Sequence, residues 1–501
     1  MLGMVRSSAI KNNSQHTIDM VRACAIKSVK AQMHHFWQNG KHEVHLCLAW
    51  SAYITYITAV GFVWSAKLHE NLAVGYEGLL SSAADFPRIA GYKPTTDVEE
   101  VLDQDLIQQK FQEILGDESC SSVDAGLTYY EGDGSLLKNL PTYKENKGAI
   151  WNLYEQYYGS KDFCDEWVTK ALKGGVFKFD NGKVDFSKFP GNLGDKDDPD
   201  GECVGREECA KKATAYICGY INVFQYLEKA VVKIEEGEGC VEQKGGCTTA
   251  SKAWDSAVAF FVGSAEGVDG NNTGGPGNGG QYGTQFYALG DKRCDDFRTC
   301  GATGDTADRS TPSKANILML GLFQQGASAI YAGDVTNARA IIKKINIQAA
   351  VPFIQGTLRY AYRLGQAKGN KPKDKEVAEG GTFLAGALPQ LWKCDKKAAK
   401  IVFKELQIGS KKVNKGKTNF KKVLKAFECN YECLGITCAQ IGVLFDGDEF
   451  DAEDPEAETT KPRFPQCTDP RTDVCAKLDD KTIKECKKYR SNKNTLDFKG
   501  L

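Results

Sequence analysis

Histidine is almost missing from this 501-residue chain, and all six histidines lie between His16 and His69. Imidazole is the usual general base of nucleophilic hydrolases and a common metal ligand. Everything after His69 therefore lacks the base that a Ser-His-Asp or Cys-His arrangement needs, and no G-x-S-x-G motif is present. These absences argue against nucleophilic catalysis and against an imidazole-rich metal site. A hydrolase that works with two carboxyl groups stays open, because it needs no histidine.

Other patterns are missing as well. No C-x-x-C pair occurs, which disfavours a zinc site. Lysine and arginine (64) balance aspartate and glutamate (65), so nothing predicts a nucleic-acid partner. We interpret the lysine-rich stretch 411–425 as a solvated helix face with its approach loop. The glycines of 275–280 follow no strand and carry no P-loop lysine, which makes a phosphate-binding loop improbable.

Cysteine is abundant, and 16 of the 18 cysteines lie at Cys120 or later. An even number of cysteines in a chain without zinc spacing predicts disulfides, up to eight of them, in an oxidising compartment. Residues 46–66 form an uncharged apolar run that follows basic residues and ends in small ones. We interpret this run as the core of a secretory signal peptide. A retained membrane anchor and a buried helix are the alternatives, and the chain is expected to meet a membrane only through 46–66 if that run is not cleaved.

The rest of the chain reads mainly as helix. Apolar residues recur at helical spacing over 101–115, behind a capping box that starts at Thr96. Further helices are expected at 147–172, 205–234, 250–265, 314–331, 335–364, 376–391, 396–407, 418–432 and 476–490. One small hairpin is predicted from 176–179 and 184–186, around the turn 180–182.

A weak internal repeat relates 123–132 to 254–263 and 217–221 to 354–358. We therefore expect a mainly α protein of two tandem, disulfide-linked helical modules. The predicted division is a leader at 1–66, modules at 67–245 and 246–440, and an acidic loop with a cysteine-containing tail at 441–501.

Two loops and one calcium-like pattern stand between the helices. Residues 267–283 are glycine-rich and contain Asn271 in an Asn-Asn-Thr sequon, a candidate glycosylation site. Residues 446–458 carry eight carboxylates and predict an exposed acidic loop. Residues 196–207 imitate a calcium loop but begin with Lys196 where an acid is required, so Ca²⁺ binding is not expected.

The second module holds the candidate ligands. The carboxylates of Asp255, Glu266, Asp291 and Glu379 and the phenol of Tyr287 form a hard oxygen-donor set that suits ferric iron, and Arg359 could hold an anion beside it. If 254–267 were one unbroken helix, Asp255 and Glu266 would be too far apart along its axis to share an ion. The alternative is a helical core edged by ordinary caps and salt bridges.

Several of these segments carry a family resemblance. The stretches 254–267, 287–300, 351–362, 378–380 and 429–438 resemble the iron-assimilation proteins of algae, a secreted, periplasmic or cell-surface family that is also described as high-CO2-inducible. The resemblance covers roughly 115–440. It implies extracytoplasmic binding of Fe(III), with or without a synergistic anion, and no catalysed reaction. A cell-surface ferrireductase or iron transporter would be the partner. The competing interpretation is a structural or interaction glycoprotein of the cell surface without a metal.

Overall fold

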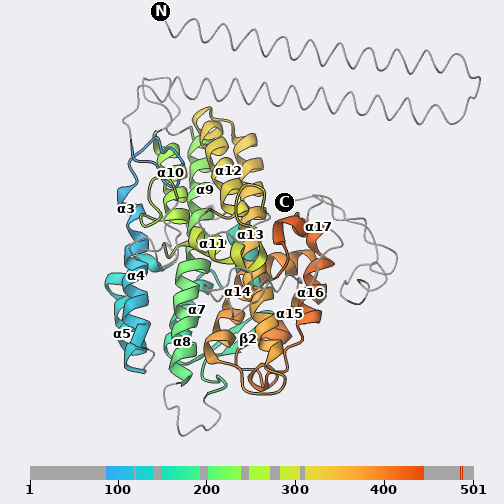
Figure 1. Ribbon diagram of the computed structural model, residues 1–501. Coiled ribbons are helices and arrows are strands. Elements are labelled where there is room, and N and C mark those ends of the chain that lie inside the picture. Colours follow the sequence, from blue (N-terminus) through green and yellow to red (C-terminus); the bar gives the residue numbers. More distant parts are fainter. Residues whose placement is uncertain are drawn as a thin grey trace, which may run out of the picture. The chain divides into compact units, whose positions relative to one another are not determined.

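A computed structural model describes residues 86–117, 120–138, 148–191, 201–237, 248–270, 283–304, 311–444, 486 and 488 (Figure 1). All of them belong to one compact unit, Ala84–Leu501. The predicted leader 1–66, the acidic loop 446–458 and Asn271 lie outside the described residues. No helix in the described part of the chain is long and apolar enough to span a membrane.

The described part is mainly helical, as predicted. Its α-helices in chain order are α3 (Glu99–Leu102), α4 (Gln104–Ile114), α5 (Cys120–Glu131), α6 (Gly148–Tyr158), α7 (Phe163–Leu172), α8 (Gly201–Lys212), α9 (Gly219–Glu235), α10 (Thr248–Val262), α11 (Phe286–Phe297), α12 (Lys314–Tyr331), α13 (Val335–Gln366), α14 (Asp374–Cys394), α15 (Lys396–Leu406), α16 (Phe420–Glu428), α17 (Tyr431–Leu434) and α18 (Cys438–Ile441). Short 3-10 turns are η1 (Leu115–Asp117), η2 (Asp133–Leu137) and η4 (Val413–Lys415), and η3 (Ala213–Cys218) is a π-helical segment between α8 and α9.

Local sequence signals account for several of these boundaries. The Ser313 side chain caps α12 by accepting from the Asn316 amide, and Asp334 caps α13 in the same way from Asn337. The predicted hairpin is confirmed as β1 (Val176–Phe179) paired antiparallel with β2 (Gly182–Asp185). Ends of elements that carry a side-chain cap or a tight turn were therefore readable from the sequence.

Other boundaries differ from the prediction. The expected helix 147–172 is divided into α6 and α7 at Gly159, whose φ of +71° no regular helix accommodates. The expected capping box at Thr96 is wrong, because α3 starts after Val98 and has no side-chain cap. The Thr96 hydroxyl donates instead to Asp255, which lies 159 residues away. Long-range partners override the local signal here.

The core is built by long helices that lie side by side (Figure 1). The most extensive contacts are those of α9 with α10, α13 with α14, and α12 with α13. Trp254 is fully buried and its indole N–H donates to the Phe323 carbonyl. Its ring packs against Gly326 of α12, where no side chain is in the way. One hydrophobic core joins helices from both sides of the predicted boundary at 245/246. The division into two related modules stays a prediction.

Disulfides join several of these elements. The bridges whose two cysteines are both described are Cys120–Cys203, Cys164–Cys218, Cys294–Cys300, Cys394–Cys433 and Cys429–Cys486, and Cys438 is disulfide-bonded as well. Such a set is consistent with an extracellular protein. The expectation that all sixteen cysteines could pair is wrong at Cys209, which is a buried free thiol.

Candidate metal centre

The centre begins at the turn that ends α10. Gly263 ends the helix with φ +83°. It lies so close to Asp105 of α4 that an added Cβ would be 2.5 Å from the Asp105 carboxylate. That carboxylate accepts from the Ser264 hydroxyl and the Ala265 amide, both at 2.7 Å. The Asp105 carbonyl accepts from the Thr284 hydroxyl at 3.1 Å. One residue of α4 thus ties down both chain segments that flank the glycine-rich loop.

Glu266 is the next residue along this turn, and it is completely buried. An added Cβ at Gly283 would lie 1.7 Å from the Glu266 Oε1 atom, so only glycine permits the chain to pass there. Within the described residues, neither carboxylate oxygen of Glu266 has a hydrogen-bond partner. A buried carboxylate without donors is costly, which marks Glu266 as a residue with a role beyond packing.

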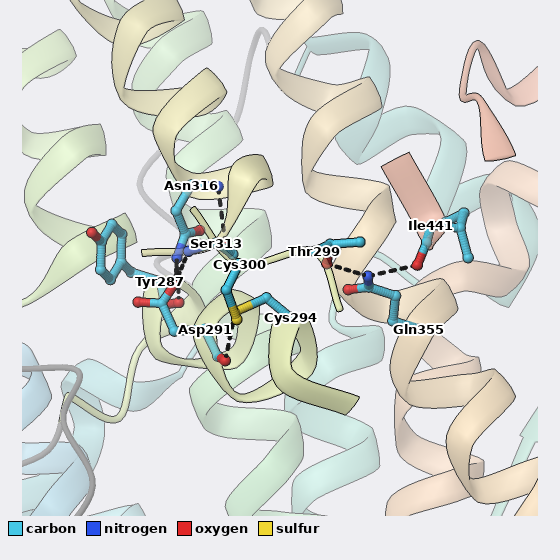
Figure 2. Close-up of a disulfide and its surroundings, with 9 residues drawn as sticks. All are labelled: Tyr287, Asp291, Cys294, Thr299, Cys300, Ser313, Asn316, Gln355 and Ile441. Carbon is cyan, nitrogen blue, oxygen red and sulfur yellow. Dashed lines mark hydrogen bonds between the residues drawn. A yellow bond between two sulfur atoms is a disulfide. The ribbon is translucent and has the colours of Figure 1, made fainter. Parts of the chain in front are cut away.

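Helix α11 brings Tyr287 and Asp291 to the same place, one turn apart (Figure 2). The Asp291 Oδ1 atom accepts from the Ser313 amide at 2.5 Å and from the Asn316 side chain at 2.7 Å. Asn316 also donates to the Tyr287 carbonyl at 2.7 Å. The start of α12 therefore fixes the position of Asp291 while occupying only one of its two oxygens.

The remaining oxygens share one property. In the described part of the chain, Asp291 Oδ2 and the Tyr287 hydroxyl have no hydrogen-bond partner, like both oxygens of Glu266. The Tyr287 ring is fully buried against Phe261, with 5.8 Å between ring centroids. Gly270 passes close to the Tyr287 hydroxyl, which an added Cβ would approach to 2.6 Å. Two carboxyl groups and one phenol thus meet in a buried place where donors from the protein are scarce.

Electrostatics ties these three groups together. Burial raises the pKa of Glu266 to about 8, and the neighbouring Asp291 adds to the rise. Burial also raises the pKa of Asp291 to about 7, against the lowering effect of its Ser313 and Asn316 partners. The pKa of Tyr287 is raised by burial and then by Asp291 and Glu266. Lys292 lowers the pKa of Glu266 only in part, so burial and the mutual repulsion of the two carboxyls make both acids resist ionisation.

Such a set of groups can hold either protons or a hard cation. A trivalent ion would replace the protons of both carboxyls and favour the phenolate. No group of three or more His, Cys, Asp or Glu side chains arranged to hold a metal occurs among the residues the structure describes. Glu266 and Asp291 are only two such side chains, and Tyr287 adds one phenol. Together they would cover only part of an octahedral ion, and water or a small anion would have to supply the rest.

Asp255, a predicted ligand, is engaged elsewhere. Its carboxylate accepts from the Tyr92 hydroxyl at 2.5 Å. It also accepts from the backbone amides of Thr95 at 2.8 Å and of Thr96 at 2.9 Å, and from both hydroxyls. Five hydrogen bonds occupy this carboxylate, so it fastens 92–96 to α10 instead of facing Glu266. The chain does break at Gly263, but the break does not bring the two acids together.

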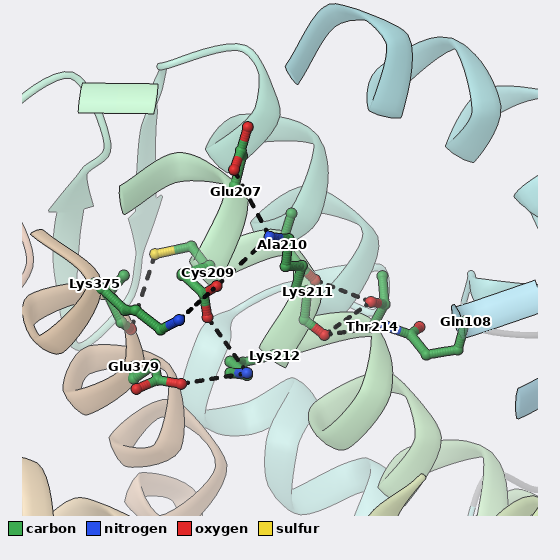
Figure 3. A network of polar contacts seen from close by, with 11 residues as sticks. Gln108, Glu207, Cys209, Ala210, Lys211, Lys212, Thr214, Lys375 and Glu379 are labelled. Atoms are coloured by element: carbon green, nitrogen blue, oxygen red, sulfur yellow. Dashed lines mark hydrogen bonds and ion pairs between the residues drawn. The ribbon is translucent and has the colours of Figure 1, made fainter. Parts of the chain in front are cut away.

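Glu379, another predicted ligand, belongs to a second cluster between α8 and α14 (Figure 3). It pairs with Lys212 at 3.2 Å, and Lys212 also pairs with Glu208 at 3.3 Å. Burial opposes ionisation of Glu208, yet Lys212, Lys211 and Lys375 hold its pKa down at about 2. Lysines compensate the acids of this cluster, so it offers no surplus negative charge to a cation.

Arg359, the predicted anion-binding residue, donates to Asp296 at 2.8 Å and lies over the Tyr360 ring at 5.1 Å. Its guanidinium is thus part of an ion pair on α11 and α13. The calcium-like pattern ends at Glu207, which accepts from Ser122 and pairs with Lys211 at 3.7 Å. Residues 196–200 of that pattern lie outside the described residues.

No local sequence pattern predicts three of the contributors to the centre. Asp105 comes from α4, far along the chain from Glu266, and Asn316 is an ordinary polar residue of α12. In the sequence, Gly283 is only one of many glycines in the loop 267–283. Their roles depend on contacts between helices that no local pattern encodes.

Comparisons with known proteins add no family at this point: no family model, no curated protein and no solved structure matches the chain.

Proposed function

We propose that this protein binds ferric iron outside the cytosol and supports iron assimilation, without catalysing a reaction. The observation that carries the proposal is the buried set of Glu266, Tyr287 and Asp291, whose four free oxygens have no hydrogen-bond partner among the described residues. Carboxylate and phenolate oxygens are hard donors, which suit a hard trivalent cation.

The donor types favour Fe(III) over the divalent ions. Ca²⁺ and Mg²⁺ are usually bound by carboxylates, carbonyls and water, whereas this set includes the phenol of Tyr287, whose phenolate form a trivalent ion favours most strongly. The absence of histidine after His69 leaves a late transition metal without the imidazole it prefers. The resemblance to algal iron-assimilation proteins points in the same direction, and the disulfides fit an extracellular location. A ferrireductase or iron transporter of the cell surface would be the partner.

The test is titration of the purified protein with ferric citrate, followed by absorbance and by iron content after gel filtration. We expect a visible phenolate-to-iron charge-transfer band that saturates as the site fills. Tyr287→Phe should remove the band and leave weaker binding through the two carboxylates. Glu266→Gln and Asp291→Asn should each lower the affinity at least tenfold, because a neutral amide replaces a charged ligand.

Glu379→Gln is the matched control, since it removes a buried carboxylate that lies in the other cluster. It should keep the band and the affinity. A colourless wild-type protein that retains no iron would contradict the proposal and favour the alternative, a metal-free glycoprotein of the cell surface. Equal loss of binding in Glu379→Gln and Glu266→Gln would also contradict it.

A further inference from the structure

Positive charge is concentrated on one part of the surface, which we call the lysine face and define as the exposed lysines of residues 393–425. This segment contains twelve lysines and only two acids, a formal charge of +10 in a chain whose total is −1. Ten of the lysines are exposed and two are half-buried. The rest of the chain is therefore acidic, and the charges of this protein are strongly segregated.

Both acids of the segment are buried and serve the fold. Asp395 caps α15 by accepting from the amides of Lys397 at 2.8 Å and Ala398 at 3.0 Å. Glu405 accepts from the Asn419 amide at 2.8 Å. Lys412 pairs with Glu405, and Lys422 approaches it at 3.9 Å. These carboxylates cannot neutralise the lysines that point away from the core.

Helix α15 shows the arrangement most clearly. Lys396, Lys400 and Lys404 follow one another at intervals of four residues, which places them on one stripe about 6 Å apart along the axis. None of the three has an ion pair with a residue that the structure describes. The opposite side of α15 is buried in the core through residues such as Val402 and Leu406.

Helix α16 packs beside α15 (Figure 1) and adds exposed lysines such as Lys421. Like charges at this spacing destabilise a helix, where an alternation with glutamate would stabilise it. A lone solvated face would gain from mixed charges, so this stripe indicates a negatively charged partner.

We propose that the lysine face is a docking surface for an acidic polysaccharide, a chain that carries sulfate or carboxylate groups. Its repeating charges match a row of flexible ammonium groups, which need no fixed hydrogen-bond geometry. Acidic polysaccharides are polyanions of the extracellular compartment with which the disulfides are consistent. The inference does not depend on the metal centre.

Other polyanions fit the face less well. A single-stranded nucleic acid needs several aromatic rings on which successive bases stack. Phe403 and Phe420 of this segment are buried, and the half-buried ring of the adjoining Trp392 is covered by the Lys396 ammonium at 4.6 Å. A membrane surface is held best when apolar side chains enter it. The large apolar residues exposed in the described part of the chain lie outside 393–425, at Leu106, Val176, Val268, Ile317 and Leu318.

The experiment is chromatography and direct binding of the full-length protein on immobilised dextran sulfate and on polygalacturonate, with uncharged dextran as the blank. At about 50 mM NaCl the wild type should be retained on a charged matrix and released towards 1 M NaCl, where the screening length falls to about 3 Å. The triple variant Lys396→Gln, Lys400→Gln, Lys404→Gln should bind about tenfold more weakly or worse and elute at lower salt.

The control variant removes the same charge from three exposed lysines on other elements, Lys161→Gln, Lys252→Gln and Lys344→Gln. It should elute with the wild type, which separates a defined surface from a simple effect of net charge. Equal shifts for the two triple variants, or no retention of the wild type, would overturn the proposal. So would tighter binding to phosphatidylserine vesicles or to single-stranded RNA than to either polysaccharide at the same salt. Circular dichroism confirms that each variant is folded.

Discussion

Replacing Glu266 by glutamine should stabilise the metal-free protein at alkaline pH while it weakens iron binding. The Glu266 carboxyl is fully buried, and no described residue donates to it. Glutamine has nearly the same shape but no charge. It therefore removes a negative charge whose burial destabilises the metal-free folded protein.

The sign follows from proton linkage. Burial raises the pKa of Glu266 from an ordinary 4.5 to about 8, so between these values the folded form holds a proton that the unfolded form has lost. The contribution of Glu266 to the free energy of unfolding is greatest below about pH 4.5. It falls by about 1.4 kcal/mol per pH unit as the pH rises to about 8. The whole decline is about 5 kcal/mol. Ionisation of Asp291, whose pKa is about 7, also lowers the stability. Because the two carboxyls interact, their separate contributions cannot simply be added.

The assay is urea unfolding of wild type and Glu266→Gln at pH 5, 7 and 9, with a chelator present. A buried amide without partners costs about 1–3 kcal/mol, so a net gain of a few kcal/mol is expected for the variant at pH 9, and little or none at pH 5. For a unit the size of Ala84–Leu501, each kcal/mol of added stability raises Tm by about 1 °C, since the unfolding entropy is ~2.1 cal/mol/K per residue.

A bound trivalent metal should make the wild type more stable than Glu266→Gln at pH 9. Excess Ga(III), a redox-inert substitute for Fe(III), should stabilise the wild type more than Glu266→Gln. If the wild type is as stable at pH 9 as at pH 5, and the variant is less stable than the wild type at both, then Glu266 is paired in the folded state and the reasoning fails.

Three further predictions concern the fold. Gly326→Ala should cost about 1–3 kcal/mol in urea unfolding, because its Cβ would lie 1.9 Å from the Trp254 ring, whereas Gly321→Ala on the same helix meets nothing within 4 Å and should be neutral or slightly stabilising. Asp255→Ala should cost about 3 kcal/mol or more, since it leaves several donors of 92–96 without an acceptor; an unchanged midpoint would show that these bonds are dispensable. The Cys209 thiol is buried and its pKa is raised by burial, so a thiol reagent should label it only after denaturation. Rapid labelling of the native protein, lost in Cys209→Ser, would contradict its burial.

The helical character and many element boundaries were determined by the sequence alone. Apolar periodicity gave the helices of 314–331 and 335–366 almost to the residue, because Ser313 and Asp334 cap them locally. The hairpin followed from its Asp-Asn-Gly turn between alternating residues. Residue chemistry also predicts Glu266, Tyr287 and Asp291 as ligands. Tyr287 and Asp291 are one turn apart on α11, and α10 contacts α11, which places the turn after α10 near them.

Only the tertiary structure decided which acids remain without partners. In the sequence Asp255, Glu266, Asp291 and Glu379 are equivalent carboxylates. The fold gives Asp255 five hydrogen bonds and Glu379 a lysine, while it buries Glu266 with no donor from the described residues. That difference arises from contacts more than a hundred residues apart, such as those of Thr95 with Asp255 and of Asp105 with Ser264. A buried carboxylate is defined electrostatically by its three-dimensional neighbours, and hydrophobic spacing along the chain does not encode them.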